Sequence, residues 1–227
     1  MRNFTTLCTL LLLLSASSCG VIPVNNSFEK AGTLKEGNVE VAGNVSAYSN
    51  MSWGWDGGST KYRFRIKNVG ARVGIGLTDK TDLKFRYEHL VSSNLEGYNR
   101  MSYYSFIPKF ALTEDEFSLM VPVSLYQYQN DNWSDESSSI TGSIAPHLLY
   151  TFTNTKKKVD FTVGLKGDLL FGEGGAVFLF GGSLGAGFSN DLTRWAVRPE
   201  VGATFLSGSM IWSYGIGLHY ILPKKRG

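Results

Sequence analysis

The chain has 227 residues with 22 basic and 19 acidic side chains, and this mild net charge of +3 does not favour nucleic acid as a partner. Its length fits one domain. Aromatic residues make up 13% of the chain, glycine is abundant at 26 residues and proline is scarce at 6. With only two cysteines, Cys8 and Cys19, the chain is not a disulfide-rich scaffold.

Residues 1–18 have the three parts of a secretory signal peptide. Arg2 gives a positive start, a leucine run follows at 10–14, and small residues precede Cys19. The apolar run is shorter than the roughly 20 residues that span a bilayer as a helix. A removable signal peptide is therefore predicted, after which Cys19 is the single cysteine left and no internal disulfide can form.

The residues Ala16-Ser17-Ser18 before Cys19 resemble the lipobox of bacterial lipoproteins. This resemblance implies a lipid attached to Cys19 and an anchor on the periplasmic side of the cell outer membrane. The family prefers leucine where this chain has Ala16, so a plain signal-peptidase site is the alternative. The polar residues 19–37 are predicted to form a lipid-anchored linker.

From residue 38 to residue 222, apolar and polar residues alternate with a period of two, which predicts β-strands. Ten strands are expected, each able to cross a bilayer at a tilt. They begin near residues 39, 62, 83, 103, 117, 140, 159, 178, 195 and 212. In the second strand the apolar phase changes between Lys67 and Asn68, which predicts a β-bulge there.

The connections between these strands alternate in kind. Short polar turns at 78–82, 113–116, 154–158 and 190–194 alternate with connections at 50–60, 93–100, 130–139, 172–175 and 207–209. The first three of these connections are longer than the turns, and short periplasmic turns with longer outer loops are typical of outer-membrane barrels. The predicted fold is all-β: a closed, antiparallel, up-and-down transmembrane β-barrel over 38–222, with a basic tail at 223–227.

The alternation leaves open which face points outward. A soluble, lipid-tethered ligand-binding barrel would bury Phe85, Phe161 and Phe180, whereas a membrane barrel would turn them to lipid. The polar face is rich in glycine, which leaves room for long charged side chains inside a narrow barrel. The apolar set is also too bulky to fill the interior of ten strands. A lipid-facing apolar surface is therefore predicted, and the soluble barrel is an alternative.

The last predicted strand contains SYGIGLHY, with Gly215, Leu218 and Tyr220 at the constrained positions of a known pattern. The stretch resembles the C-terminal assembly signal of bacterial outer-membrane barrels, although the chain continues beyond Tyr220 where that signal usually ends on an aromatic residue. Residues 38–222 as a whole resemble the small outer-membrane β-barrel proteins of Gram-negative bacteria. The resemblance implies the barrel-assembly machinery as a partner during biogenesis.

An outward apolar face places charged side chains of both signs inside the barrel. The predicted lumen network comprises Arg72, Lys84, Arg86, Glu88, Lys109, Lys166, Asp168, Arg198 and Glu200, and Glu40 and Asp160 share this face. In a narrow lumen such charges must pair or lose much of their solvation energy. The sequence predicts a lumen closed by ion pairs, and a narrow charge-lined channel for small solutes is the alternative.

The candidate residues for an enzyme are few. His89, His147 and His219 lie on three different predicted strands, with no paired carboxylates, metal-ligand spacing or Ser-His-Asp set around them. The chain is therefore predicted to be non-enzymatic, without a cofactor or metal. The expected role is a structural or accessory subunit of an outer-membrane assembly, with membrane lipid and other outer-membrane proteins as partners.

Overall fold

The computed structural model describes residues 24–52, 61–93, 100–130, 137–154, 158–172, 175–206 and 209–224. These residues form one twelve-stranded sheet. The strands are β1 Val39–Ser52, β2 Lys61–Thr78, β3 Thr81–Ser93, β4 Arg100–Thr113, β5 Phe117–Met120, β6 Val123–Asn130, β7 Ser137–Ile144, β8 His147–Asn154, β9 Val159–Gly172, β10 Gly175–Phe188, β11 Trp195–Leu206 and β12 Ser209–Leu222. In the described part of the chain, no helix is long and apolar enough to cross a membrane.

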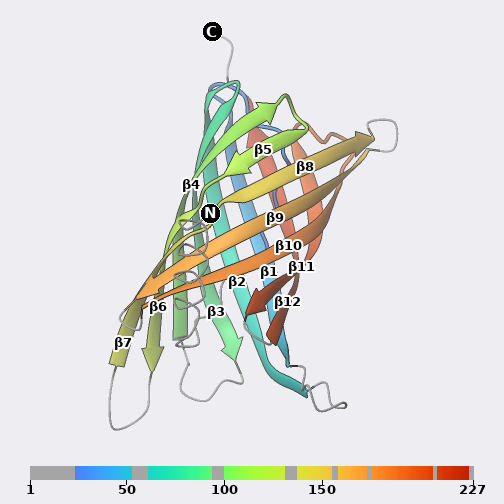
Figure 1. Ribbon diagram of the computed structural model, residues 1–227. Helices are drawn as coiled ribbons and strands as arrows, with labels where there is room; N and C mark the ends of the chain where they lie inside the picture. Colours follow the sequence, from blue (N-terminus) through green and yellow to red (C-terminus); the bar gives the residue numbers. More distant parts are fainter. Residues whose placement is uncertain are drawn as a thin grey trace, which may run out of the picture.

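The sheet closes on itself (Figure 1). β1 pairs with β12 along its whole length, from Val39 opposite Leu222 to Ser52 opposite Ser209. Every other pairing is also antiparallel, and along most of the barrel each strand pairs with the strands before and after it in the sequence. The sheet consequently has no free edge. The prediction of a closed, antiparallel, up-and-down barrel is confirmed.

Two of the barrel's strands are interrupted by proline. β5 and β6 both pair with β4, with one register shift between Ala111 and Thr113, and β8 and β7 both pair with β9 in one uninterrupted register. Pro122 separates β5 from β6, and Pro146 separates β7 from β8. Proline has no amide hydrogen to donate to the ladder, so the hydrogen bonding is interrupted at each of these residues and resumes beyond it. The twelve strands thus make ten passes of the barrel wall, as the sequence predicted.

The β-bulge lies at the predicted height but on the neighbouring strand. At Lys67 the register between β2 and β3 shifts, and the extra residue, Val91, belongs to β3 between Leu90 and Ser92. β2 therefore keeps its alternation, with Ile66 facing inward and Lys67 outward. The phase change predicted in β2 is wrong, because the alternation of β2 continues unbroken past this height.

Apolar side chains cover the outer surface of the barrel, and charged side chains lie in its lumen. Phe85, Phe161 and Phe180 point outward and are 48%, 53% and 52% exposed, whereas Glu88 and Lys109 are fully buried in the lumen. A soluble barrel would show the reverse, because its apolar side chains would fill the interior. An apolar outer surface fits lipid contact, which confirms the predicted orientation of the two faces.

Residues 24–37, named the luminal segment below, correct the prediction of a linker outside the barrel. They run inside the lumen without regular secondary structure, and Asn26, Phe28, Glu29 and Leu34 are buried there. Near the turn end of the barrel, the Gly37 amide donates to the Gly76 carbonyl at 2.8 Å, just before β1 begins. Polar composition alone cannot separate a solvated linker from a segment that hydrogen-bonds to a charged lumen.

Candidate functional site in the charged lumen

Glu29 of the luminal segment is the centre of the largest ion-pair cluster. Its carboxylate lies 3.1 Å from Arg72 Nη1, 2.8 Å from Lys84 Nζ and 3.1 Å from Lys109 Nζ, which come from β2, β3 and β4. Glu40 of β1 completes the cluster, 2.7 Å from Arg72 and 3.1 Å from Lys84. All five side chains are almost wholly buried. Three wall cations therefore hold one carboxylate of the segment.

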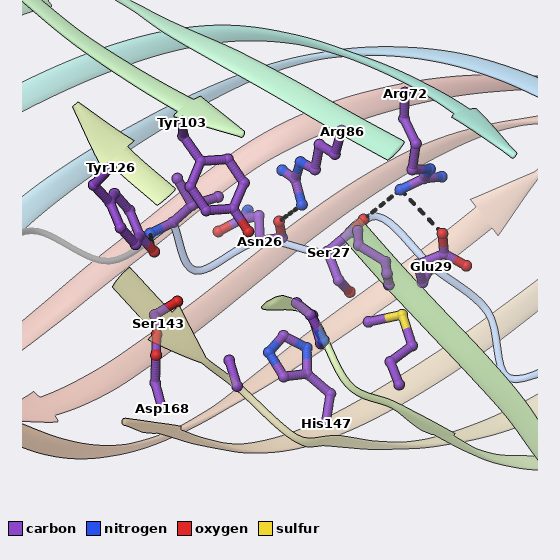
Figure 2. Close-up of a pocket in the computed structure, with 15 residues that line it drawn as sticks. Asn26, Ser27, Glu29, Arg72, Arg86, Tyr103, Tyr126, Ser143, His147 and Asp168 are labelled. Atoms are coloured by element: carbon purple, nitrogen blue, oxygen red, sulfur yellow. Dashed lines mark hydrogen bonds and ion pairs between the residues drawn. The ribbon is translucent and has the colours of Figure 1, made fainter. Parts of the chain in front are cut away.

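Two arginines fix the backbone beside Glu29. Arg72 and Arg86 lie directly opposite each other on β2 and β3. Arg72 Nη1 donates to the Ser27 carbonyl at 2.8 Å, and Arg86 Nη1 donates to the Asn26 carbonyl at 2.7 Å (Figure 2). Like charges at facing positions repel each other, and here each arginine is bonded to an adjacent carbonyl of the segment.

Glu200 of β11 binds the luminal segment from the opposite wall. Its carboxylate accepts the backbone amides of Ser27 and Phe28, each at 2.7 Å. Phe28 has φ of 53°, a left-handed conformation that is strained for a bulky side chain. Turning the backbone in this way lets successive amides converge on one anion, as in other anion-binding backbone nests.

The other predicted lumen charges are also buried, and they have different partners. Glu88 pairs with Arg86 and accepts the Asn44 amide at 2.8 Å, and Arg198 pairs with Asp160. Both ion pairs join side chains of the wall, and Arg86 also donates to the Asn26 carbonyl of the luminal segment. They leave the cation cluster around Glu29 as the main electrostatic attachment of the segment.

Asp168 of β9 lines a small cavity between the segment and the wall (Figure 2), and Lys166 lines a second small cavity. Lys166 Nζ donates to the Val24 carbonyl at 3.5 Å, and Ser143 hydrogen-bonds to Asp168. His147 lines the first cavity, whose volume of about 10 Å³ holds about one water molecule. A solute larger than water has no room beside the segment at this height.

The turn end of the luminal segment is attached at the barrel rim. Lys35 Nζ lies 3.2 Å from Glu114 and 3.4 Å from Asp115, in the turn between β4 and β5. Partial burial lowers the pKa of Lys35, but the hydrogen bond to Glu114 and the charge of Asp115 outweigh it and raise that pKa overall. At the same rim, Lys224 Nζ lies 3.1 Å from Glu36. These exposed pairs contribute little individually.

Glycines of β12 make room for Phe28. A Cβ added at Gly215 or Gly217 would lie 2.8 Å from the Phe28 side chain. In the predicted assembly signal, Gly215 thus lines the lumen, while Leu218 and Tyr220 face outward with about half their surface exposed. The predicted role of inner-wall glycine, to accommodate charged neighbours, is therefore incomplete, since Gly215 and Gly217 accommodate an aromatic ring of the segment.

Buried apolar and tyrosine side chains cluster in the loop-side half of the lumen. We name as the apolar vestibule the cluster of buried side chains that line this half. Its members are Tyr48, Ile66, Leu90, Met101, Tyr103, Tyr126, Tyr128, Leu170, Val177, Leu179 and Ile211, and Val24 of the luminal segment packs among them. The Val24 amide donates to the Tyr126 hydroxyl at 3.1 Å. The ion-pair cluster around Glu29 thus lies towards the turn end of the lumen, and the apolar vestibule lies towards the loop end, where Asp168 is opposite Leu179.

The three histidines do not form a shared site. His89 lies on β3 near the loop end, where its Nδ1 is 3.4 Å from the hydroxyl oxygens of both Tyr87 and Ser102. His147 on β8 and His219 on β12 are buried in the lumen. Among the residues that the structure describes, no group of three His, Cys, Asp or Glu side chains could hold a metal ion. Cys19 lies outside the described residues.

Glu29 and the luminal segment are the main features that sequence reasoning missed. A signal was present, because the short turn at 78–82 places Arg72 and Arg86 on facing strands at one height. Two buried arginines at facing positions need acceptors, and each guanidinium has more N–H donors than its one wall carboxylate, Glu40 or Glu88, can satisfy. A carboxylate and free carbonyls from elsewhere in the chain were therefore to be expected.

Comparison with known proteins gives structural matches only. No protein-family model matches the chain. No curated protein matches it either. The outer membrane protease OmpT of Escherichia coli matches with a TM-score of 0.46 and 11% identity, over 86% of this chain and 100% of that one. An outer membrane channel of Pseudomonas putida F1 matches with a TM-score of 0.48 and 8% identity, over 89% and 100% of the two chains. The NanC porin matches with a TM-score of 0.44 and 13% sequence identity, over 80% of this chain and 98% of that one.

The chain's own geometry places it among outer-membrane barrels. Ten passes close into one antiparallel barrel, the outer surface is apolar, and the lumen holds the charges. A barrel is one of the two structures that can satisfy all backbone groups within a bilayer. The protein is therefore a small outer-membrane β-barrel.

Proposed function

We propose that this protein is a non-enzymatic outer-membrane lipoprotein whose barrel is closed by its own luminal segment and acts as a structural or accessory subunit of a larger outer-membrane assembly. The observation that carries the proposal is the position of Glu29, bound to Arg72, Lys84 and Lys109 at 2.8–3.1 Å within a filled lumen. A buried carboxylate with three cations is costly to release. The resting barrel is therefore closed to solutes.

Electrical recording tests the closed state directly. Purified full-length protein, refolded and inserted into planar lipid bilayers, should show no steady conductance. Heat-modifiable migration on gels would first establish that the inserted protein is folded. A steady open conductance from folded, full-length protein would overturn the closed lumen and favour a channel.

Co-purification tests the accessory role. Extraction in a mild detergent should bring down a defined outer-membrane partner in fixed ratio with the barrel. Partners of this kind would contact the apolar outer wall or the loops, since the lumen is occupied. Recovery of the barrel from native membranes without any second protein in fixed ratio would contradict a subunit role.

A second candidate function is a gated narrow channel, and one observation favours it. The hydrogen bonds shown between residues 24–34 and the barrel wall each involve a side chain. For example, the Ala31 amide donates to the Thr151 hydroxyl, and the Leu34 amide donates to the Asp82 carboxylate. The closing ladder between β1 and β12 does not include this segment. The segment could leave the lumen without opening the barrel wall, so a channel would be gated by its release.

A further inference from the structure

The barrel wall binds the luminal segment through the backbone of the segment. The amides of residues 24, 27, 28, 31 and 34 each donate to a side chain of the wall. The carbonyls of residues 24, 26, 27, 30 and 32 each accept from a lysine or arginine of the wall. Most of these wall groups are charged, and charged groups make the stronger hydrogen bonds. The wall therefore holds this stretch as a peptide ligand is held, without pairing it as a strand.

Two adjacent side chains fix the position of the segment in the lumen. The Phe28 ring is buried against Gly215 and Gly217, and the Arg86 guanidinium carbon lies 5.8 Å from the ring centroid. The Glu29 carboxylate is bound by the three cations of its cluster. Buried aromatic anchors and desolvated charged contacts usually dominate the affinity of an interface. A peptide shifted by one residue would place its aromatic ring against the cations, so the order of these two side chains sets the register.

Lys109 of β4 has all its hydrogen bonds with the luminal segment. Its Nζ donates to the Glu29 carboxylate at 3.1 Å, to the Lys30 carbonyl at 2.7 Å and to the Gly32 carbonyl at 2.8 Å. An ammonium group has three donors, so the segment satisfies every one of them. Lys109 is fully buried, and a buried charge without partners is costly. A lumen without the segment would therefore favour any peptide that restores these acceptors.

Burial along the segment shows which of its other side chains matter. Ala31 is buried in a cluster with Ile107, Met120 and Leu149, where a larger side chain would have to displace its neighbours. Lys30 is only half-buried, whereas every other residue from 24 to 34 is buried. The lumen thus fits an aromatic residue, an acidic residue, any residue and a small residue, in that order.

We infer that the lumen is a peptide-binding site, that residues 24–34 are its resident ligand, and that it takes a separate peptide with the same order of side chains. The inference rests on the closed resting state proposed above and adds the class of molecule that the lumen recognises. The contacts are not covalent, so the link to β1 acts by raising the effective concentration of the segment. A terminal segment of a partner protein with this order of residues would compete for the same site.

Binding of a peptide in trans tests the inference. In the full-length protein, residues 24–34 are replaced by a Gly-Ser sequence of equal length, which removes both anchors and the resident ligand. The probe is a synthetic peptide of residues 24–34, acetylated and amidated at its ends, and binding is measured by calorimetry in detergent. A peptide with residues 28 and 29 exchanged is the matched control, because its composition and charge are unchanged. A second peptide carries Glu29→Gln, and the parent protein serves as the occupied barrel.

We expect the peptide to bind the Gly-Ser variant one to one, and the Glu29→Gln peptide to bind at least about tenfold more weakly, because the cations lose their anion. The exchanged peptide should not bind. If the Gly-Ser variant does not fold alone, the peptide of residues 24–34 should restore its heat-modifiable form during refolding, and the exchanged peptide should not. Equal effects of these two peptides would overturn the inference. A folded variant that binds no peptide, or an unfolded one that the peptide does not rescue, would overturn it as well.

The parent protein separates this test from that of the proposed function. An occupied lumen should bind no added peptide. Binding to a parent protein that shows no conductance would place the peptide outside the lumen and contradict the inference. Binding to a parent protein that conducts steadily would instead contradict the closed resting state, while the peptide site would stand.

Discussion

At the scale of single residues, the attachment of the luminal segment depends on one buried carboxylate. Replacing Glu29 by Ala leaves Arg72, Lys84 and Lys109 with Glu40 as the remaining acid of the cluster. Removing one partner of a buried ion pair costs about 3–5 kcal/mol. We expect Glu29→Ala to unfold at lower urea concentration than the parent protein in detergent, as followed by heat-modifiable gel migration.

Lys224→Ala provides the matched control for that measurement. Lys224 pairs with Glu36 at the exposed rim, where a pair is worth about 0.2–1 kcal/mol. The unfolding midpoint of this variant should stay close to that of the parent. Equal midpoints for the Glu29 and Lys224 variants would mean that the cation cluster contributes no net stability.

The packing of Phe28 gives a prediction in which a second substitution should cancel the effect of the first. Gly217→Ala adds a Cβ about 2.8 Å from Phe28, so the ring must shift and the segment loosens. We expect limited proteolysis to cut the luminal segment faster in this variant. Adding Phe28→Gly removes the Cβ and the ring that the new methyl group would meet, and the double variant should be cut no faster than Phe28→Gly alone. If Gly217→Ala speeds cleavage equally in both backgrounds, the two residues do not act through this contact.

At the scale of elements, the luminal segment and the wall make separable contributions. Replacing residues 24–34 by a Gly-Ser sequence of equal length removes Glu29 and most of the other side chains of the luminal segment, but leaves the ladder between β1 and β12 complete. We expect a folded, heat-modifiable barrel that now shows steady conductance in planar bilayers. The vacated site is lined by three cations and by Glu40, so anions should pass preferentially. A silent variant would show that the wall side chains alone close the lumen.

The strands were predictable from the sequence and the luminal segment was not, for a physical reason. Successive side chains of each strand point alternately to lipid and to the lumen, so a period of two predicts that Phe85 faces outward and Lys84 faces inward. A segment inside the lumen has no repeating environment, because each residue meets a different wall. Asn26, Glu29 and Thr33 therefore have the composition of a loop although they are buried.

Register explains the error in the predicted bulge. The alternation around Lys67 was assigned to β2 from that strand alone, whereas the extra residue is Val91 on β3. A bulge is a property of two paired strands, and one strand read by itself does not show which member of the pair carries the additional residue. The nine lumen charges, by contrast, are all buried, because their positions follow from strand phase alone.

At the scale of the whole molecule, we expect the barrel to stay in the membrane without a lipid attached to Cys19. The outer surface is apolar on every pass, with Val41 and Leu218 as examples from β1 and β12, and each is about half exposed. Burying such area against lipid contributes about 25 cal/mol for each Å² removed from water, so the summed contribution of the passes far exceeds that of a single anchor.

We therefore expect Cys19→Ala to remain in the outer membrane and to require detergent for extraction, with heat-modifiable migration equal to that of the parent. Cys8→Ala, which changes a cysteine of the predicted leader, is the matched control. Mass spectrometry of the mature chain reports whether lipid was present before the change. Release of Cys19→Ala into the aqueous fraction after membrane washing would mean that the apolar wall does not face lipid, and the membrane barrel would have to be abandoned.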